Sequence, residues 1–164
     1  MASISAAGVL PRSQYNGSDY YYFGVTSGKK EITTFCGRKN PGEKNRKCAA
    51  REFMEESLGA ITSEDKIKKI LKVLKNVTRI ENRAVKQVTY ITPLKIKGNP
   101  MAIFNKKRNA PGLKAHQKEI KEIVAIKVSD LISQVRANNR IYKGHAFRGD
   151  AWGTLQLALK NNQL

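Results

Sequence analysis

The sequence predicts an α/β protein, on the basis of two observations. Segments rich in β-branched and aromatic residues are followed by segments with the apolar periodicity of amphipathic helices. In addition, 164 residues of which 40% are hydrophobic suffice to bury the core of one domain. The chain has no internal repeat and no linker long enough to divide it, so we expect a single domain over residues 1–164.

The first part of the chain is predicted to form three strands. They cover residues 3–11, the aromatic run 20–25 and residues 31–36, with polar turns between them. The third strand ends on Gly37, and the loop of residues 37–42 follows it. Because Gly37 has no side chain, this loop can bring its backbone close to a ligand.

The next segment is predicted to form a helix with two different faces. At about 100° per residue, Glu52, Glu55 and Glu56 fall on one side of the helix. The other side is apolar and consists of Ala49, Ala50, Phe53, Met54 and Leu58. Like charges at these spacings repel, so we expect a cation among the three acids. A hard divalent ion with oxygen ligands is the natural candidate.

The stretch that contains this helix resembles the signature of the Nudix hydrolases, G-x5-E-x7-R-E-U-x-E-E-x-G-U, in which U is a bulky aliphatic or similar residue. The matching positions are Gly37, Glu43, Arg51, Glu52, Phe53, Glu55 and Glu56. Two residues, Ser57 and Leu58, precede Gly59 where the family usually has one, and Ala60 is smaller than the family prefers. The extra residue lies beyond the last acid, so we expect a changed helix exit and an intact acidic face. The alternative is a surface helix with incidental acids.

The resemblance implies an α/β/α sandwich with a mixed sheet and an enzyme that hydrolyses a diphosphate linkage. It further implies that Glu52, Glu55, Glu56 and the Gly37 carbonyl bind Mg²⁺ or Mn²⁺. The cation would neutralise the diphosphate and activate water. Arg51 would orient Glu52 and pair with Glu43. Glu52 itself, or an acid outside this motif, would accept the proton.

Two acids in the run KEIKEIVAIKVSDL are candidates for the additional acid. This run resembles the segment before a late strand in which many Nudix enzymes carry a further Glu, and the K-E-I-x-x-I form found in mRNA-decapping members. By that match we favour Glu119 over Glu122. For each of them, the alternative is a surface acid among lysines.

The remaining elements are predicted from periodicity and capping residues. A helix over residues 62–77 carries a lysine-rich face, which is either solvated or part of a substrate platform. Two strands with a turn near Asn82 cover residues 78–97, and Val85 is an expected core residue. Residues 129–138 form a short helix. Asp150 caps a closing helix that ends at about residue 160 and should cover the sheet face opposite the acidic helix.

Residues 98–112 are predicted to form a long mobile loop that binds substrate, because Gly, Pro and Asn punctuate them. Phe104 would stack on a base or ring, and Lys106, Lys107 and Arg108 would hold phosphates. The alternative is a charged loop with Phe104 in the core.

The charge indicates a polyanionic partner. Thirty-one Lys and Arg face thirteen Asp and Glu, which gives a net charge of +18. Three substrates fit the resemblance: capped or triphosphorylated RNA, a diphosphoinositol polyphosphate, and a small nucleotide such as ADP-ribose, a dinucleoside polyphosphate or a nucleoside triphosphate. We favour RNA cap or nucleotide hydrolysis. The alternative from another class is a Nudix-fold module that binds RNA or a protein without catalysis.

Other features of the sequence indicate the cellular compartment of the protein. No apolar run approaches the length of a membrane span, and residues 1–12 lack the basic start of a signal peptide. Cys36 and Cys48 form no C-x-x-C motif, which favours a reducing compartment. We expect the cytoplasm, with the nucleus or a host cell as alternatives. The resemblance also suggests a homodimer.

Overall fold

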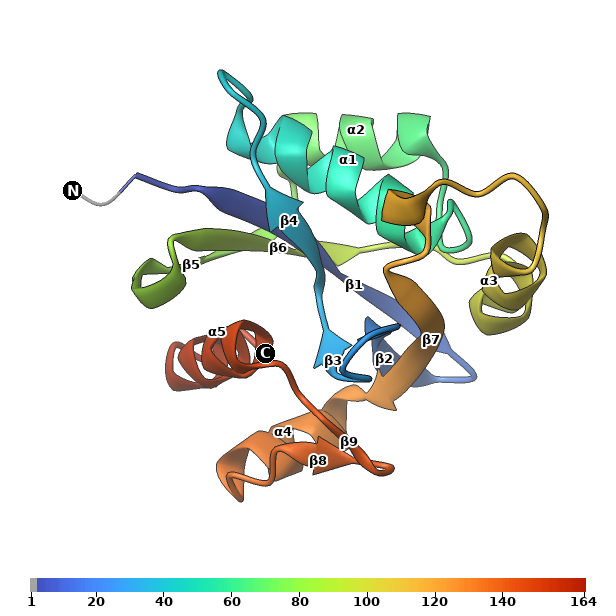
Figure 1. The fold of residues 1–164 in the computed structure, drawn as a ribbon. Helices are drawn as coiled ribbons and strands as arrows, with labels where there is room; N and C mark the ends of the chain where they lie inside the picture. Colours follow the sequence, from blue (N-terminus) through green and yellow to red (C-terminus); the bar gives the residue numbers. More distant parts are fainter. Residues whose placement is uncertain (1–2) are drawn as a thin grey trace.

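The computed structural model describes residues 3–164, so Met1 and Ala2 of the predicted domain lie outside the described residues. Within this range, one mixed seven-stranded sheet lies between two layers of helices (Figure 1). The predicted α/β/α sandwich is therefore confirmed. The strands of the sheet are β1 (Ala6–Tyr15), β2 (Ser18–Thr26), β3 (Ile32–Thr33), β4 (Phe35–Arg38), β5 (Thr78–Asn82), β6 (Gln87–Pro93) and β7 (Ile120–Lys127).

The sheet divides at one edge of its central strand, β1. The carboxyl-terminal half of β1 pairs with β2, whereas its amino-terminal half pairs with β4, both antiparallel. On its other edge β1 runs parallel to β6. Strand β7 continues the sheet beyond β2, and within residues 3–164 β4 pairs only with β1. The edge of β4 that faces away from β1 is thus left open to side chains from other elements.

Two apolar cores lie on the two faces of the sheet. On one face, Phe53 packs edge to face against Phe35. On the other face, Trp152 packs against Phe147. The first face is covered by α1 (Asn45–Ser57), α2 (Glu64–Val73) and α3 (Pro100–Arg108), and the second by α4 (Val128–Arg136) and α5 (Gly149–Lys160). The closing helix therefore covers the face opposite the acidic helix, as predicted.

The helix ends follow from local chemistry. Ser63 caps α2 by accepting a hydrogen bond from the Lys66 amide at 3.3 Å. Helix α1 ends at Ser57, its cap residue Leu58 adopts the left-handed conformation with φ of 55°, and Gly59 follows with φ of 68°. The extra residue before Gly59 thus belongs to a two-residue left-handed exit, beyond the acidic face.

Four local predictions were wrong. Residues 98–112 are not a loop, because Asn99 caps a helix through the amides of Met101 and Ala102, and Pro100 fits its first turn. Arg148, not Asp150, occupies the cap position of α5. Val85 is 43% exposed in a 3₁₀ turn. The predicted third strand is split at Thr34 into β3 and β4, which pair with different partners. A short hairpin, β8 (Ile141–Tyr142) with β9 (His145–Ala146), precedes α5.

Candidate active site

The acidic face of α1 lies against β4 at Gly37. A Cβ atom at this position would overlap the carboxylate carbon and both carboxylate oxygens of Glu52. Only glycine therefore lets the strand and the acid approach each other this closely. The carbonyl of Gly37, a predicted metal ligand, lies 3.5 Å from Cys48 Sγ.

Arg51 is the centre of an ion-pair network. It binds Glu43 through Nε at 2.9 Å and Nη2 at 2.8 Å, so the predicted pair is present. Its Nη1 donates to Glu52 at 2.8 Å and to Glu55 at 3.5 Å. These contacts lower the pKa of Glu43 to about 2, because the guanidinium favours its ionised form. All three acids are thereby held by one cation.

Glu56 is different, because it is almost entirely buried, with an exposed fraction of 5%. Its Oε1 has no hydrogen-bond partner in the described residues. Burial raises the pKa of Glu56 well above its usual value, and the charges of Glu52 and Glu119 add to the effect. Burial also raises the pKa of Glu52, against the opposing effect of Arg51. The site therefore contains carboxylates whose negative charge is not fully compensated.

The structure brings Glu119, not Glu122, to this site. Glu119 lies immediately before β7 and is near enough to raise the pKa of both Glu52 and Glu56. Glu122 lies within β7, and its carboxylate is 3.8 Å from Nε2 of His145 in the β8–β9 hairpin. The two candidates thus have different surroundings, and Glu119 is the one beside the acids of α1.

The donor set fits a hard divalent cation in its chemistry. Glu56 offers a buried oxygen without a partner, and Glu52 and Glu119 are close enough to repel it. A divalent cation binds such oxygens and removes their repulsion. Within residues 3–164, however, no group of three or more His, Cys, Asp or Glu is already arranged around a common metal position. In this arrangement the Arg51 guanidinium neutralises part of the charge of Glu52 and Glu55, because it forms ion pairs with both.

The basic segment predicted to bind substrate has other contacts. Phe104 is fully buried in the core, so it cannot stack on a ligand, and that prediction was wrong. Lys107 donates to the Leu58 carbonyl at 3.0 Å, and Arg108 donates to the carbonyls of Ile120 and Lys118. Both side chains therefore hold α3 to α1 and β7. Lys106 is exposed.

Arg148 is a residue of this region that sequence reasoning missed. Its Nη2 lies 3.3 Å from Cys36 Sγ, next to Gly37 in β4, and its charge opposes the raised pKa of Glu56. No pattern in the sequence joins residues that are 112 positions apart. The only local signal is the pairing of Arg148 with Asp150 at the start of the closing helix.

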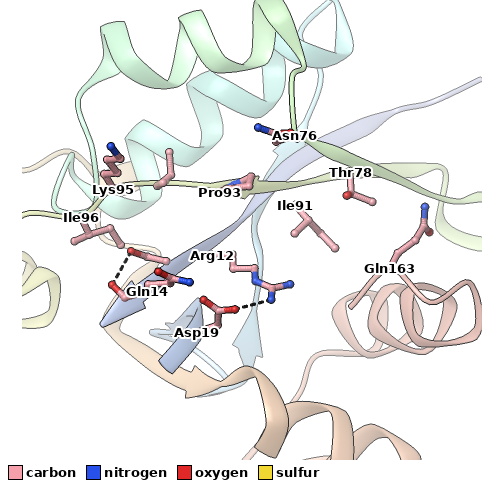
Figure 2. Close-up of a pocket in the computed structure, with 12 residues that line it drawn as sticks. Arg12, Gln14, Asp19, Asn76, Thr78, Ile91, Pro93, Lys95, Ile96 and Gln163 are labelled. Carbon is pink, nitrogen blue, oxygen red and sulfur yellow. Dashed lines mark hydrogen bonds and ion pairs between the residues drawn. The ribbon is translucent and has the colours of Figure 1, made fainter. Parts of the chain in front are cut away.

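Two cavities lie away from the acidic face of α1. One has a volume of about 700 Å³ and is lined by residues of β1, β2, β5 and β6, among them the ion pair of Arg12 and Asp19 (Figure 2). A second cavity of about 550 Å³ lies beside it, lined by Tyr15, Tyr20 and Tyr22. None of the predicted site residues lines either cavity.

Among the described residues, no helix is both long and apolar enough to cross a membrane.

No family model matches the sequence, and no curated protein gives a significant match. Solved structures with a similar fold do exist. The NUDIX domain of Shewanella oneidensis NrtR complexed with ADP ribose has a TM-score of 0.55 at 7% identity, covering 99% of this chain and 90% of that one. A C. elegans Ap4A hydrolase binary complex has a TM-score of 0.50 at 19% identity, and the match covers 78% of this chain and 83% of that one. The Nudix hydrolase RenU from M. smegmatis has a TM-score of 0.51 at 10% identity, and the match covers 99% of this chain and 88% of that one. At these identities the likeness establishes the fold.

Proposed function

Because the chain has the Nudix fold, we propose that it is a metal-dependent hydrolase of diphosphate linkages in nucleoside-diphosphate derivatives. One observation carries this proposal: the carboxylate of Glu56, with an unpartnered buried oxygen, lies beside Glu52 on the helix that bears the family's acids. A buried carboxylate oxygen without a partner is costly in a purely structural role. Its retention is explained if a cation binds there.

The residues have separate tasks in this proposal. Glu52, Glu55, Glu56 and the Gly37 carbonyl would hold Mg²⁺ or Mn²⁺, which neutralises phosphoryl charge and makes water a better nucleophile when it is bound. Arg51 would keep Glu52 oriented through its 2.8 Å contact. Glu119, exposed at the start of β7 and close to Glu52 and Glu56, would accept the proton of the attacking water.

We propose a small nucleoside-diphosphate derivative as the substrate. Two of the similar structures are an Ap4A hydrolase and a complex with ADP ribose, and both molecules belong to this class. The contacts of residues 98–112 weaken the case for long RNA as the substrate. Phe104 is buried, and Lys107 and Arg108 donate hydrogen bonds to main-chain carbonyls.

Capped RNA is a second candidate, which the charge favours. The net charge is +18, and the lysines of α2 lie on its exposed face, where Lys66, Lys69 and Lys72 have no acidic partner among the described residues. Such a surface attracts polyanions of any kind, and a diphosphoinositol polyphosphate is also one.

A panel of substrates tests the proposal. The purified protein is incubated with Mg²⁺ or Mn²⁺ and ADP-ribose, diadenosine polyphosphates, free cap dinucleotide, capped RNA or a diphosphoinositol polyphosphate, and the products are separated by chromatography. We expect hydrolysis of the small nucleotides that stops when the metal is chelated. Turnover of long capped RNA alone, weakened steeply by salt, would favour the second candidate. No turnover of any substrate would contradict the proposed function and favour a binding module.

A further inference from the structure

We propose that Arg148 binds a phosphate group of the substrate and forms the cationic side of the site whose acidic side is Glu52 and Glu56. This inference rests on the proposed hydrolysis of a diphosphate. It assigns a role to a residue outside the acidic motif, in the segment that leads into α5.

The main chain fixes the position of Arg148. Its amide donates to the Ile32 carbonyl at 2.8 Å, and the preceding Phe147 forms a parallel bridge with Ile32. The start of α5 is therefore tied to β3, just before the chain enters β4. In this place the Arg148 side chain reaches β4 from the face opposite α1.

The guanidinium is held rigidly and keeps a free donor. Arg148 donates through Nε to Asp150 Oδ1 at 2.7 Å and through Nη2 to Oδ2 at 3.0 Å. Its Nη2 also contacts Cys36 Sγ at 3.3 Å. In the part of the chain that the structure describes, Nη1 makes no hydrogen bond. Because 35% of the side chain remains exposed, a ligand can reach it.

Arg148 also lies within electrostatic reach of the acids. Its Nη2 lies 3.3 Å from Sγ of Cys36, whose neighbour Gly37 lies against the Glu52 carboxylate, and the charge of Arg148 opposes the rise in the pKa of Glu56 that burial causes. Cys36 links the two residues in space, because its Sγ contacts Arg148 and its main-chain N–H also counteracts the rise in the pKa of Glu56. Arg148 and Glu56 thus approach the same residue of β4 from opposite faces of the sheet.

The chemistry of the substrate calls for such a cation. A diphosphate carries negative charge into a site that already holds Glu52, Glu55, Glu56 and Glu119. Arg51 is engaged by acids of the protein, including Glu43. A planar guanidinium binds phosphate with directed, charge-assisted hydrogen bonds. The two hydrogen bonds from Arg148 to Asp150 hold the guanidinium in place before substrate arrives, which limits the entropy lost on binding. Arg148 is therefore arranged to bind phosphate oxygen.

A purely structural role for Arg148 is the competing explanation, because its contacts also join α5 to β4. The chain offers a matched control for this role. Arg12 forms an ion pair with Asp19 at 2.8 Å, with side-chain exposures of 33% and 31%, against 35% and 23% for Arg148 and Asp150. It lies in the cavity of Figure 2, which contains no residue of the acidic site.

The experiment compares Arg148→Met with Arg12→Met. KM and kcat are measured for ADP-ribose with Mg²⁺, the Kd of its methylene-bridged analogue is measured by calorimetry, and Tm is measured by calorimetric scanning. We expect Arg148→Met to raise KM and Kd roughly 10- to 100-fold, the effect of losing charge-assisted hydrogen bonds. Arg12→Met should leave KM and Kd within about twofold of the wild type, while it lowers Tm by about as much as Arg148→Met does.

Two further variants keep the test decisive. Arg148→Lys retains the charge and should recover most of the affinity, whereas a lysine variant as weak as the methionine variant would count against phosphate binding. If Arg148→Met does not fold, Arg148→Gln keeps an amide donor for Asp150 and removes the charge, and it should show the same rise in KM.

The outcomes separate this inference from the proposed function. Wild-type turnover together with unchanged KM and Kd in Arg148→Met would overturn the role of Arg148 and leave the hydrolase intact. A wild-type protein that neither hydrolyses ADP-ribose nor binds its analogue, and that turns over no other diphosphate of the panel, would contradict the proposed function and with it this inference.

Discussion

Arg51 and Glu43 form a two-point ion pair that joins the turn before α1 to the middle of that helix, with Nε–Oε2 and Nη2–Oε1 distances of 2.9 and 2.8 Å. Through Nη1 the same guanidinium holds Glu52 at 2.8 Å. The turn, the helix and an acid of the candidate site are thus fixed by one side chain.

This pair makes stability depend on pH. Arg51 lowers the pKa of Glu43 from 4.5 to about 2. Because the folded-state pKa is depressed, the stabilisation is complete above the unfolded value and is lost as the pH falls from 4.5 through 2. We expect Glu43→Gln to cost about 1–2 kcal/mol at pH 7 and almost nothing near pH 2. Urea unfolding at several pH values measures this, with the exposed Glu64→Gln as control. A difference that does not change with pH would contradict the account.

The contact between Gly37 and Glu52 predicts a large effect of one methyl group. In Gly37→Ala the new Cβ would collide with the Glu52 carboxylate. We expect a loss of about 1–3 kcal/mol of stability from overpacking and about 100-fold in turnover from the displaced acid. Gly28→Ala is the matched control, because a Cβ at Gly28 meets no atom within 4 Å. Equal activity of the two variants would show that Glu52 need not lie against β4.

The two acids near β7 are expected to differ in function. Glu119→Gln should lower turnover by about 10²–10⁴-fold, the usual contribution of a general base, because Glu119 lies beside Glu52 and Glu56. Glu122→Gln should retain activity, since Glu122 faces His145. Steady-state kinetics of the two variants, which remove the same charge three residues apart, decide between them. The reverse order of activities would move the role to Glu122.

Phe104 is predicted to matter for stability and not for substrate binding. It is fully buried in the core beneath α3. Phe104→Ala should therefore cost about 3–5 kcal/mol and leave KM unchanged in the fraction that remains folded. Lys106→Ala, at an exposed position of the same helix, should change stability by less than about 0.5 kcal/mol. A raised KM with little loss of stability would restore the stacking role of Phe104.

The acidic motif was predictable because its signals are local, and the sandwich was predicted from the family that this motif resembles. Glu52, Glu55 and Glu56 share one face of α1 through helical spacing alone, and Gly37 and Glu43 stand at fixed distances from them. Trp152 and Leu155 likewise mark the buried side of α5. Signals of this kind need no knowledge of tertiary contacts.

The parts that could not be predicted depend on long-range contacts. Residues 98–112 contain turn-forming residues, yet Asn99 and Pro100 begin a helix because Phe104 is buried beneath it. Thr34 lies where β1 exchanges one partner strand for another. The approach of Arg148 to Cys36 and Glu56 depends on how α5 docks on the sheet, which no local pattern encodes.

The most direct test of the central claim is the metal dependence of diphosphate hydrolysis in Glu56→Gln. ADP-ribose and diadenosine tetraphosphate are supplied with increasing Mg²⁺ or Mn²⁺ to the wild type, to Glu56→Gln and to the control Glu81→Gln, whose charge lies on β5. We expect metal-dependent turnover in the wild type and the control. Glu56→Gln should show no turnover and an equal or higher Tm, because the substitution removes a buried acid that has an unpartnered oxygen. Full activity in Glu56→Gln would contradict the claim that this face of α1 binds the catalytic cation.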